Sequence, residues 1–137
     1  MPALRTGSTA DIEAVLALWR SAASVPTVSD TREALAALLT RDPRALVVAE
    51  LGGAVVGSVI AGWDGWRGNV YRLAVSPEHR RNGIGSALVR EAERRLRDRG
   101  ASRMSAIVVD DDPAAIGFWH ASGLTRQSRR ARFVRNL

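Results

Sequence analysis

Near the start of the chain, apolar residues recur at the spacing of a helix. Positions i, i+3, i+4 and i+7 are filled by Ile12, Val15, Leu16 and Trp19. This spacing puts the apolar side chains on one face and predicts an amphipathic helix. A short strand is expected before it, over Ala3 to Thr6. A second helix is expected to start near Thr31 and to end at Asp42-Pro43, because the residue before a proline disfavours helical backbone.

The middle of the chain has the pattern of three consecutive strands. Ala45 to Glu50 and Ala54 to Trp63 are mostly apolar or small, and Leu51-Gly52-Gly53 between them is typical of a tight hairpin turn. A loop over residues 64–68 precedes a further strand from Asn69 to Val75. We expect the first two strands to form a hairpin.

In the second half, apolar side chains at every fourth position predict a helix that starts near Gly83. The stripe consists of Ile84, Leu88, Ala92 and Leu96. Gly100 then follows in the place where helices commonly end. A strand over Arg103 to Val109 and a short helix over Ala115 to Ala121 come next, the latter introduced by the cap residues Asp112-Pro113. The tail beyond this helix is expected to supply one or two short strands.

The element order β-α-α-β-β-β-α-β-α-β predicts an α/β fold, with a mixed sheet covered by helices. The 137 residues fit one domain, spanning 1–137. No apolar run approaches the roughly 18 residues of a membrane span, and the first residues lack the pattern of a signal peptide. There is no cysteine, so disulfides and thiolate metal or redox sites are excluded. We expect a cytoplasmic protein with no metal and no membrane association.

The formal charge of +6 invites a nucleic-acid interpretation, but the charge pattern does not favour it. All 20 basic residues are arginine, and many lie in segments of mixed sign. The helical pairs Glu91–Arg95, Glu93–Arg97 and Arg94–Asp98 are typical of a solvated helix face. Only the tail from Arg126 to Arg135 is purely basic, with five arginines and no acid.

Two glycines stand where the long helix begins, although glycine disfavours helix interiors. Gly83 and Gly85 follow Arg80 and Arg81 at the end of a strand and its loop. Unpaired N–H groups and the helix dipole attract anions at such a point, and glycine lets a phosphate approach the backbone. The Rossmann pattern fails because Leu88 fills its third glycine position, and a P-loop fails because the chain has no lysine. The segment therefore predicts a different pyrophosphate site.

The segment Arg80-Arg81-Asn82-Gly83-Ile84-Gly85, preceded by "LAVSPEH", matches the pattern R-x-x-G-x-G. It resembles the coenzyme A loop of the GNAT superfamily of acyl-CoA N-acetyltransferases. The element order and the segment "AIGFWHASGL" from Ala115 to Leu124 are also similar to that family. The resemblance implies a mostly antiparallel sheet with a splayed strand before the loop. It also implies acetyl-CoA as acyl donor and an amine as acceptor, and it leaves a homodimer open.

The resemblance carries specific roles onto this sequence. Main-chain groups of Leu73, Ala74 and Val75 would pair with the pantetheine arm, and the Val75 N–H would face the thioester carbonyl as an oxyanion donor. The pyrophosphate would be held by Arg80 and by the main-chain amides of Arg81, Asn82, Gly83, Ile84, Gly85 and Ser86. Asp112 would contact pantetheine or serve only as a helix cap, and Phe118 would line the cofactor or pack in the core.

The general acid departs from the family pattern. The family's usual tyrosine is replaced by Trp119, whose indole N–H donates a hydrogen bond but supplies no proton near neutral pH. Trp119 can still pack against or orient the cofactor sulfur. Tyr71, expected to share a strand face with Leu73 and Val75, is a candidate acid or could orient a water molecule, although packing at the edge of the core would also explain it. Solvent is a further source of the proton. His120 is expected to be simply exposed.

The base and the acceptor are less specified by the sequence. Asp64 is the nearest acidic candidate for a base, although forming the turn of its loop would also explain it. Trp63 and Trp66 flank it and could bind an apolar or cationic acceptor, or cover the edge of the core. The sequence therefore predicts N-acetyl transfer to a primary amine by direct attack in a ternary complex. The alternative is a CoA-binding sensor without catalysis.

Overall fold

The computed structural model describes residues 1–22 and 26–137. The chain forms two compact units, Met1–Ala106 and Ile107–Leu137. Within the described residues, the sheet and three of the four α-helices belong to the first unit. The expectation of one domain over residues 1–137 stays a prediction.

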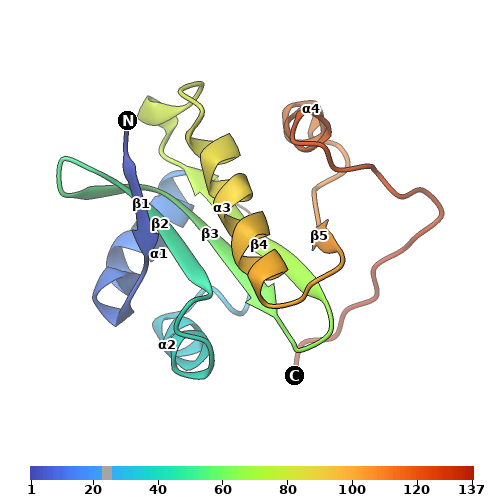
Figure 1. Ribbon diagram of the computed structural model, residues 1–137, viewed down its shortest axis with the longest axis horizontal. Coiled ribbons are helices and arrows are strands. Elements are labelled where there is room, and N and C mark those ends of the chain that lie inside the picture. The colour runs from blue at the N-terminus through green and yellow to red at the C-terminus, as the bar shows by residue number, and fades with distance from the viewer. Residues whose placement is uncertain (23–25) are drawn as a thin grey trace. The chain divides into compact units, whose positions relative to one another are not determined.

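The first unit is a five-stranded sheet with helices on both faces (Figure 1). Its strands are β1 (Ala3–Thr6), β2 (Leu46–Leu51), β3 (Ala54–Trp63), β4 (Gly68–Val75) and β5 (Met104–Ala106). Its α-helices are α1 (Ile12–Ser21), α2 (Arg32–Arg41) and α3 (Ile84–Asp98). The strands lie in the order of the sequence, antiparallel except for the parallel pair β4–β5. The predicted α/β fold with a mixed, mostly antiparallel sheet is confirmed.

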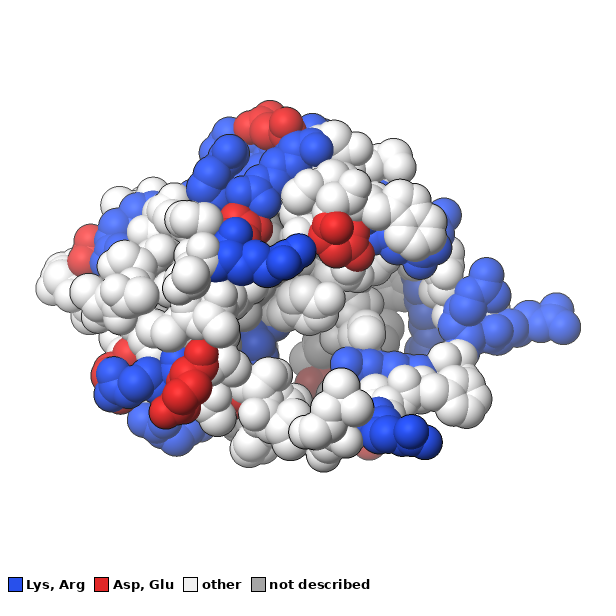
Figure 2. All heavy atoms as spheres, turned by 90° about the horizontal axis from the view of Figure 1, so that it is seen from below, with Lys and Arg blue, Asp and Glu red and all other residues white. Residues whose placement is uncertain are grey.

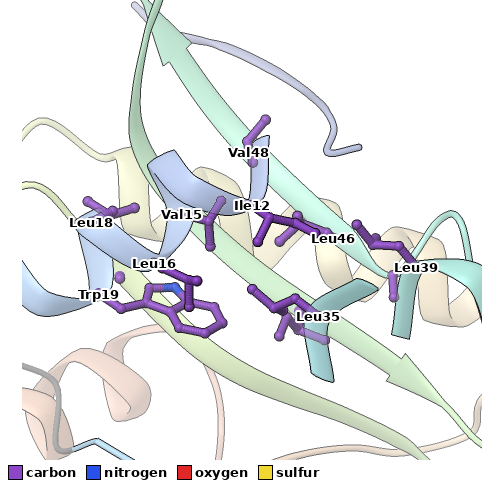
Figure 3. Close-up of a cluster of buried hydrophobic side chains, with 12 residues drawn as sticks. Ile12, Val15, Leu16, Leu18, Trp19, Leu35, Leu39, Leu46 and Val48 are labelled. Carbon is purple, nitrogen blue, oxygen red and sulfur yellow. The ribbon is translucent and has the colours of Figure 1, made fainter. Parts of the chain in front are cut away.

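Neighbouring residues of β3 pack against helices on opposite faces of the sheet. The Trp19 indole of α1 donates a hydrogen bond of 3.0 Å to the buried Ser58 hydroxyl. A Cβ added to Gly57 would lie 3.0 Å from the Leu88 side chain of α3. A buried hydrophobic cluster joins side chains of α1 and α2 to Leu46 and Val48 of β2 (Figure 3). The stripes predicted for α1 and α3 are thus buried on the two faces.

The hairpin turn between β2 and β3 forms as the sequence predicts. Gly52 and Gly53 have φ of 58° and 81°, so both central residues adopt the left-handed backbone of a two-residue hairpin turn. The strand before it runs one residue further than expected, to Leu51.

A bulge interrupts β4. Ser58 pairs with Ala74, but Ile60 pairs with Tyr71, so Arg72 and Leu73 together stand opposite one residue of β3. The inserted residue reverses the alternation of side chains along the strand. Tyr71 consequently lies on the sheet face of Ile60 and Ala74. The expectation that it shares a face with Leu73 and Val75 is wrong.

The two parallel strands separate after three residues. Gly68 to Val70 pair with β5, and the ladder ends at Val70 and Ala106 in the part of the chain that the structure describes. The rest of β4 therefore leaves its second edge without a strand partner in this sheet. The expected strand Arg103–Val109 shortens to Met104–Ala106, and the bulge of β4 at Arg72 and Leu73 follows two residues beyond Val70, the last residue that pairs with β5.

The second unit contains α4 (Pro113–Ala121). Asp112 caps it as predicted, its Oδ1 accepting a hydrogen bond of 3.1 Å from the Ala115 N–H. Gly123 follows with φ of 90°. The tail strands that the sequence analysis expects are absent from the described residues after α4, where the arginine-rich segment is exposed. A strand is stabilised by hydrogen bonds to neighbouring strands, and this segment pairs with none among the described residues.

Candidate active site

The loop between β4 and α3 turns its backbone towards open space. Arg81 and Gly83 have φ of 65° and 78°, both left-handed. The first helical bond runs from the Ala87 N–H to the Gly83 carbonyl at 3.0 Å, so the N–H groups of Ile84, Gly85 and Ser86 precede it without helical partners. A Cβ added to Gly83 meets nothing within 4 Å. This geometry suits an anion approaching the start of a helix.

The side chains of the loop divide between tethering it and facing solvent. Arg80 donates two hydrogen bonds to main-chain carbonyls, at 3.3 Å to Val75 and at 3.2 Å to Ala22 after α1. The Asn82 amide donates to the His79 carbonyl at 3.4 Å. Arg81 is exposed. Arg80 therefore tethers the loop to the end of β4, and both Arg80 and Arg81 are exposed.

The end of β4 contains the residues that are predicted to bind the pantetheine arm and the thioester oxygen. Leu73 and Val75 are half-buried and Ala74 is buried, so the side chains of this segment hold it in the sheet while one edge of its backbone stays without a strand neighbour. The chain then turns at Ser76, whose N–H donates to the Val56 carbonyl at 2.8 Å. The residues predicted to bind the thioester and those predicted to bind the pyrophosphate are thus only a few positions apart in the chain.

Asp64 lies at the other end of β4. Its carboxylate accepts hydrogen bonds from the N–H groups of Trp66 at 2.8 Å and Arg67 at 2.6 Å, forming the turn between β3 and β4. The hydrogen bond from the Arg67 N–H has the largest effect and, with that from Trp66, it lowers the pKa of Asp64. The carboxylate is therefore a weaker base than an ordinary aspartate. The seven residue steps from Gly68 to Val75 span roughly 23 Å. The geometry therefore supports the turn-forming role of Asp64, at the end of β4 far from Val75.

Tyr71 is 46% exposed, and its ring lies against Gly62, where an added Cβ would be 2.8 Å from Cε2. It precedes Val75 by four residues, on the order of 10 Å along the strand. Its hydroxyl could therefore serve a reacting atom at Val75 only through water.

Aromatic residues of the hairpin tip lie apart from the β4 end. Trp66 is exposed, with the Arg67 guanidinium 4.2 Å from its ring centroid, and Trp63 is half-buried. The cation that Trp66 meets in the structure is therefore a residue of the protein itself.

The remaining predicted residues belong to the second unit. Asp112 performs its capping role. Phe118 and Trp119 are half-buried and form an edge-to-face pair, with ring centroids 5.3 Å apart and planes at 86°. His120 is exposed, as expected. The indole of Trp119 is thus held by a neighbouring ring.

Arg72 belongs to none of the motifs that mark site residues in the sequence, yet it has unusual contacts in the structure. Its side chain forms a bidentate ion pair with Asp30, which directly precedes the Thr31 cap of α2. The available signal was a charged residue inside the otherwise uncharged strand segment "VYRLAV".

The charged surface has mixed sign. Arginines and carboxylates are interspersed on the face that Figure 2 shows. Arg94 pairs with both Glu91 and Asp98, as expected of a solvated helix face. Arg95 is different: it is only 9% exposed and donates to the Arg44 carbonyl and the Thr6 hydroxyl besides Glu91, so its predicted solvated role is wrong. Among the described residues, no helix has both the length and the apolar character needed to cross a membrane.

Comparison with known proteins gives a consistent result. Residues 12–124 match the model of the Acetyltransferase (GNAT) family. The chain is 35% identical over 116 residues to an acetyltransferase of Yersinia enterocolitica, covering 85% of this chain and 82% of the relative.

Two solved structures show the same fold. Ard1 from Thermoplasma volcanium has a TM-score of 0.82 at 24% identity, over 92% of this chain and 84% of that one. The PaiA N-acetyltransferase from Thermoplasma acidophilum, in complex with coenzyme A, has a TM-score of 0.75 at 16% identity, over 88% and 87%.

Proposed function

Because the chain belongs to the GNAT family of acetyltransferases, we propose that it transfers an acetyl group from acetyl-CoA to a primary amine by direct attack in a ternary complex. Its activity as an acetyltransferase that uses acetyl-CoA follows from the family. The acceptor and the mechanism are the proposed part. The observation that supports an acetyl-CoA site is the left-handed turn at Gly83, which opens the start of α3 a few residues after the strand end of β4, whose second edge has no strand partner in this sheet.

The start of α3 is suited to the pyrophosphate. Three N–H groups without helical partners, at Ile84, Gly85 and Ser86, coincide with the positive end of the helix dipole. The open space at Gly83 lets oxygen atoms approach the backbone. In this proposal Arg81 adds a charge-assisted contact, while Arg80 and Asn82 hold the loop in shape.

The end of β4 would hold the pantetheine arm and the thioester. Main-chain groups of Leu73 on the open edge would pair with amide groups of pantetheine, as one strand pairs with another. The main-chain groups of Ala74 face β3 instead, because Ala74 pairs with Ser58 and the Ser76 N–H donates to the Val56 carbonyl. The Val75 N–H would donate to the thioester oxygen as negative charge develops on it. The family resemblance alone assigns cofactor binding to three further residues, Asp112, Phe118 and Trp119.

The reaction then needs two proton transfers. The acceptor must attack the acetyl carbon as a neutral amine, and its nitrogen then gives up a proton to solvent, while the CoA thiolate gains a proton as the carbon–sulfur bond breaks. The indole of Trp119 cannot provide that proton. We assign protonation of the thiolate to solvent or to the Tyr71 hydroxyl acting through water. Small amines, amino acids, peptide N-termini and protein lysines all remain acceptor classes.

Thiol release from acetyl-CoA, measured with a panel of these amines, tests the proposal. We expect release that depends on one acceptor class, with an N-acetylated product identified by mass. Intersecting initial-velocity lines would support a ternary complex, whereas parallel lines would indicate a covalent acetyl-enzyme. Saturable CoA binding with no acceptor-dependent release would contradict the proposal and favour a sensor.

A further inference from the structure

The bulge of β4 contains an arginine where the backbone favours glycine. Arg72 has φ of 53°, a left-handed conformation that non-glycine residues seldom adopt. In bulges of this general kind the left-handed residue is commonly glycine. The position therefore carries a conformational strain that some other interaction must offset.

The Arg72 side chain makes the interactions that offset this strain. Its guanidinium is paired with Asp30 through two bonds, one of them from Nε to Oδ1 at 3.0 Å. It also lies over the Trp19 ring, 5.4 Å from the centroid. The two charged side chains are only 17% and 15% exposed. A bidentate pair with this little solvent contact fixes its partners more firmly than a surface ion pair does.

These contacts join the bulge to the helices on one side of the sheet. Asp30 ends a turn in which its own carboxylate accepts from the Thr27 N–H at 3.0 Å, directly before α2. Trp19 is bonded to Ser58, and Ser58 pairs with Ala74 on the far side of the bulge. The bulge is thus flanked by the part-buried Arg72–Asp30 pair on one side and by the buried Trp19–Ser58 hydrogen bond, next to Ala74, on the other.

We propose that Arg72 is a positioning residue for acetyl transfer, and that its contacts with Asp30 and Trp19 hold the β4 bulge so that the Val75 N–H stays aimed at the thioester oxygen. The inference rests on the proposed function. Arg72 touches no substrate in this proposal and acts through the backbone of Leu73 to Val75. A small misplacement of an oxyanion donor is expected to reduce the rate much more than it reduces cofactor binding.

Two variants separate the side chain from the backbone conformation. Arg72→Gly permits the left-handed backbone but removes the guanidinium. Asp30→Asn keeps the size of the partner but removes its charge. Arg99→Ala is the matched control, because Arg99 forms a comparable bidentate pair with Asp42, both bonds at 2.7 Å, at the opposite end of α3 from Gly83.

The readout is the infrared carbonyl band of acetyl-CoA labelled with ¹³C at the carbonyl carbon, recorded free and bound. A hydrogen bond to the carbonyl lowers the frequency of this band, so the frequency reports the oxyanion contact without an acceptor. Affinity for CoA lacking the acetyl group is measured by calorimetry. For R72G and D30N we expect the bound band to return towards its solution position while the CoA affinity stays close to wild type. Thiol release with the active amine should fall roughly 10- to 100-fold.

A band in R72G and D30N that shifts on binding as in wild type would overturn the inference, since the backbone alone would then hold the donor. A loss of the shift in R99A as well would also overturn it, by pointing to general loosening. If R72G does not fold, the nearly isosteric D30N carries the same test. Absence of the shift in wild type would refute the proposed role of Val75 and this inference with it, which distinguishes the two failures.

Discussion

The Arg80 guanidinium donates a hydrogen bond of 3.3 Å to the main-chain carbonyl of Val75, five residues before it. A second bond of 3.2 Å reaches the Ala22 carbonyl after α1. One side chain thus connects the loop of the proposed pyrophosphate site to the strand end of the proposed thioester site. Because Arg80 also carries charge, it can contribute to CoA binding both by holding the loop in shape and by attracting the phosphates.

The double variant Arg80→Ala/Arg81→Ala should weaken CoA binding by roughly 1–3 kcal/mol. It should also flatten the salt dependence of the affinity, because charge-assisted phosphate contacts are screened by ions. Isothermal titration over a range of salt concentrations measures both effects. Arg90→Ala, which removes the same charge from an exposed position of α3, is the control and should change neither quantity appreciably. A salt slope equal to that of wild type would show that the two arginines do not meet the phosphates.

Glutamate at Gly83 should abolish CoA binding, because it places charge and bulk where phosphate oxygens approach the backbone. Gly83→Ala separates this effect from the cost of the conformation. The added Cβ has open space, so alanine should lower the free energy of unfolding only by the left-handed strain, about 1–2 kcal/mol. Thermal unfolding and CoA titration of both variants provide the comparison. A folded Gly83→Glu protein that binds CoA like wild type would place the site elsewhere.

Local motifs were the features that the sequence could predict. The Gly52-Gly53 turn and the Asp112 cap depend on residues within three positions of each other, so their chemistry is readable in the sequence. The glycines at the start of α3 are of the same kind. The chain order of the elements then sufficed for the fold class, because hairpins and short connections limit the sheet topology.

Features that depend on distant residues were missed. "VYRLAV" has the pattern of a regular strand whether or not a residue is inserted, because the bulge at Arg72 exists only relative to β3. Arg95 has a carboxylate four residues before it, as a solvated residue would, yet the Arg44 carbonyl and the Thr6 hydroxyl bury it. Such contacts arise from packing and leave no periodic signal in the sequence.

The Arg5–Asp11 pair should make stability depend on acid pH. Arg5 bonds both Asp11 oxygens at 2.9 Å and lowers the pKa of Asp11 to about 2 from its ordinary value of 3.8. A pKa lowered by folding stabilises the protein above the unfolded value, and this contribution disappears as the pH falls towards the folded value. Asp11→Asn should therefore lower the free energy of unfolding by about 1–2 kcal/mol at neutral pH, allowing for the partial exposure of Arg5.

The difference in free energy of unfolding between wild type and Asp11→Asn should shrink as the pH falls from about 4 to about 2, because the wild-type carboxyl becomes protonated in this range. Urea unfolding at a series of pH values measures it. Asp98→Asn, which removes a half-exposed carboxylate paired with Arg94, is the control and should cost at most about 1 kcal/mol. A destabilisation by Asp11→Asn that is the same at both ends of the range would contradict the assignment.

Trp119 tests how the thiolate is protonated. Its ring packs edge-to-face on Phe118, a contact worth about 0.5–1.5 kcal/mol, so Trp119→Ala should lose stability and cofactor affinity while Trp119→Phe keeps most of both. Trp119→Tyr places a phenol where the family has its usual acid. If departure of the thiolate limits the rate, kcat should rise in this variant, by up to the roughly 10²–10⁴-fold that general acid catalysis provides.

The pH profile of kcat distinguishes the outcomes for Trp119→Tyr. A phenol that donates the proton must be protonated, so the gain in kcat should disappear as the pH rises through the tyrosine pKa, near 10 for an ordinary tyrosine. Trp119→Phe lacks the hydroxyl and is the control, with no such loss at high pH. An unchanged kcat in Trp119→Tyr would indicate that attack by the amine limits the rate, in which case solvent suffices for the thiolate. A collapse of kcat with CoA affinity intact would instead show that the indole itself positions the thioester or the acceptor, and would contradict the packing role given to Trp119.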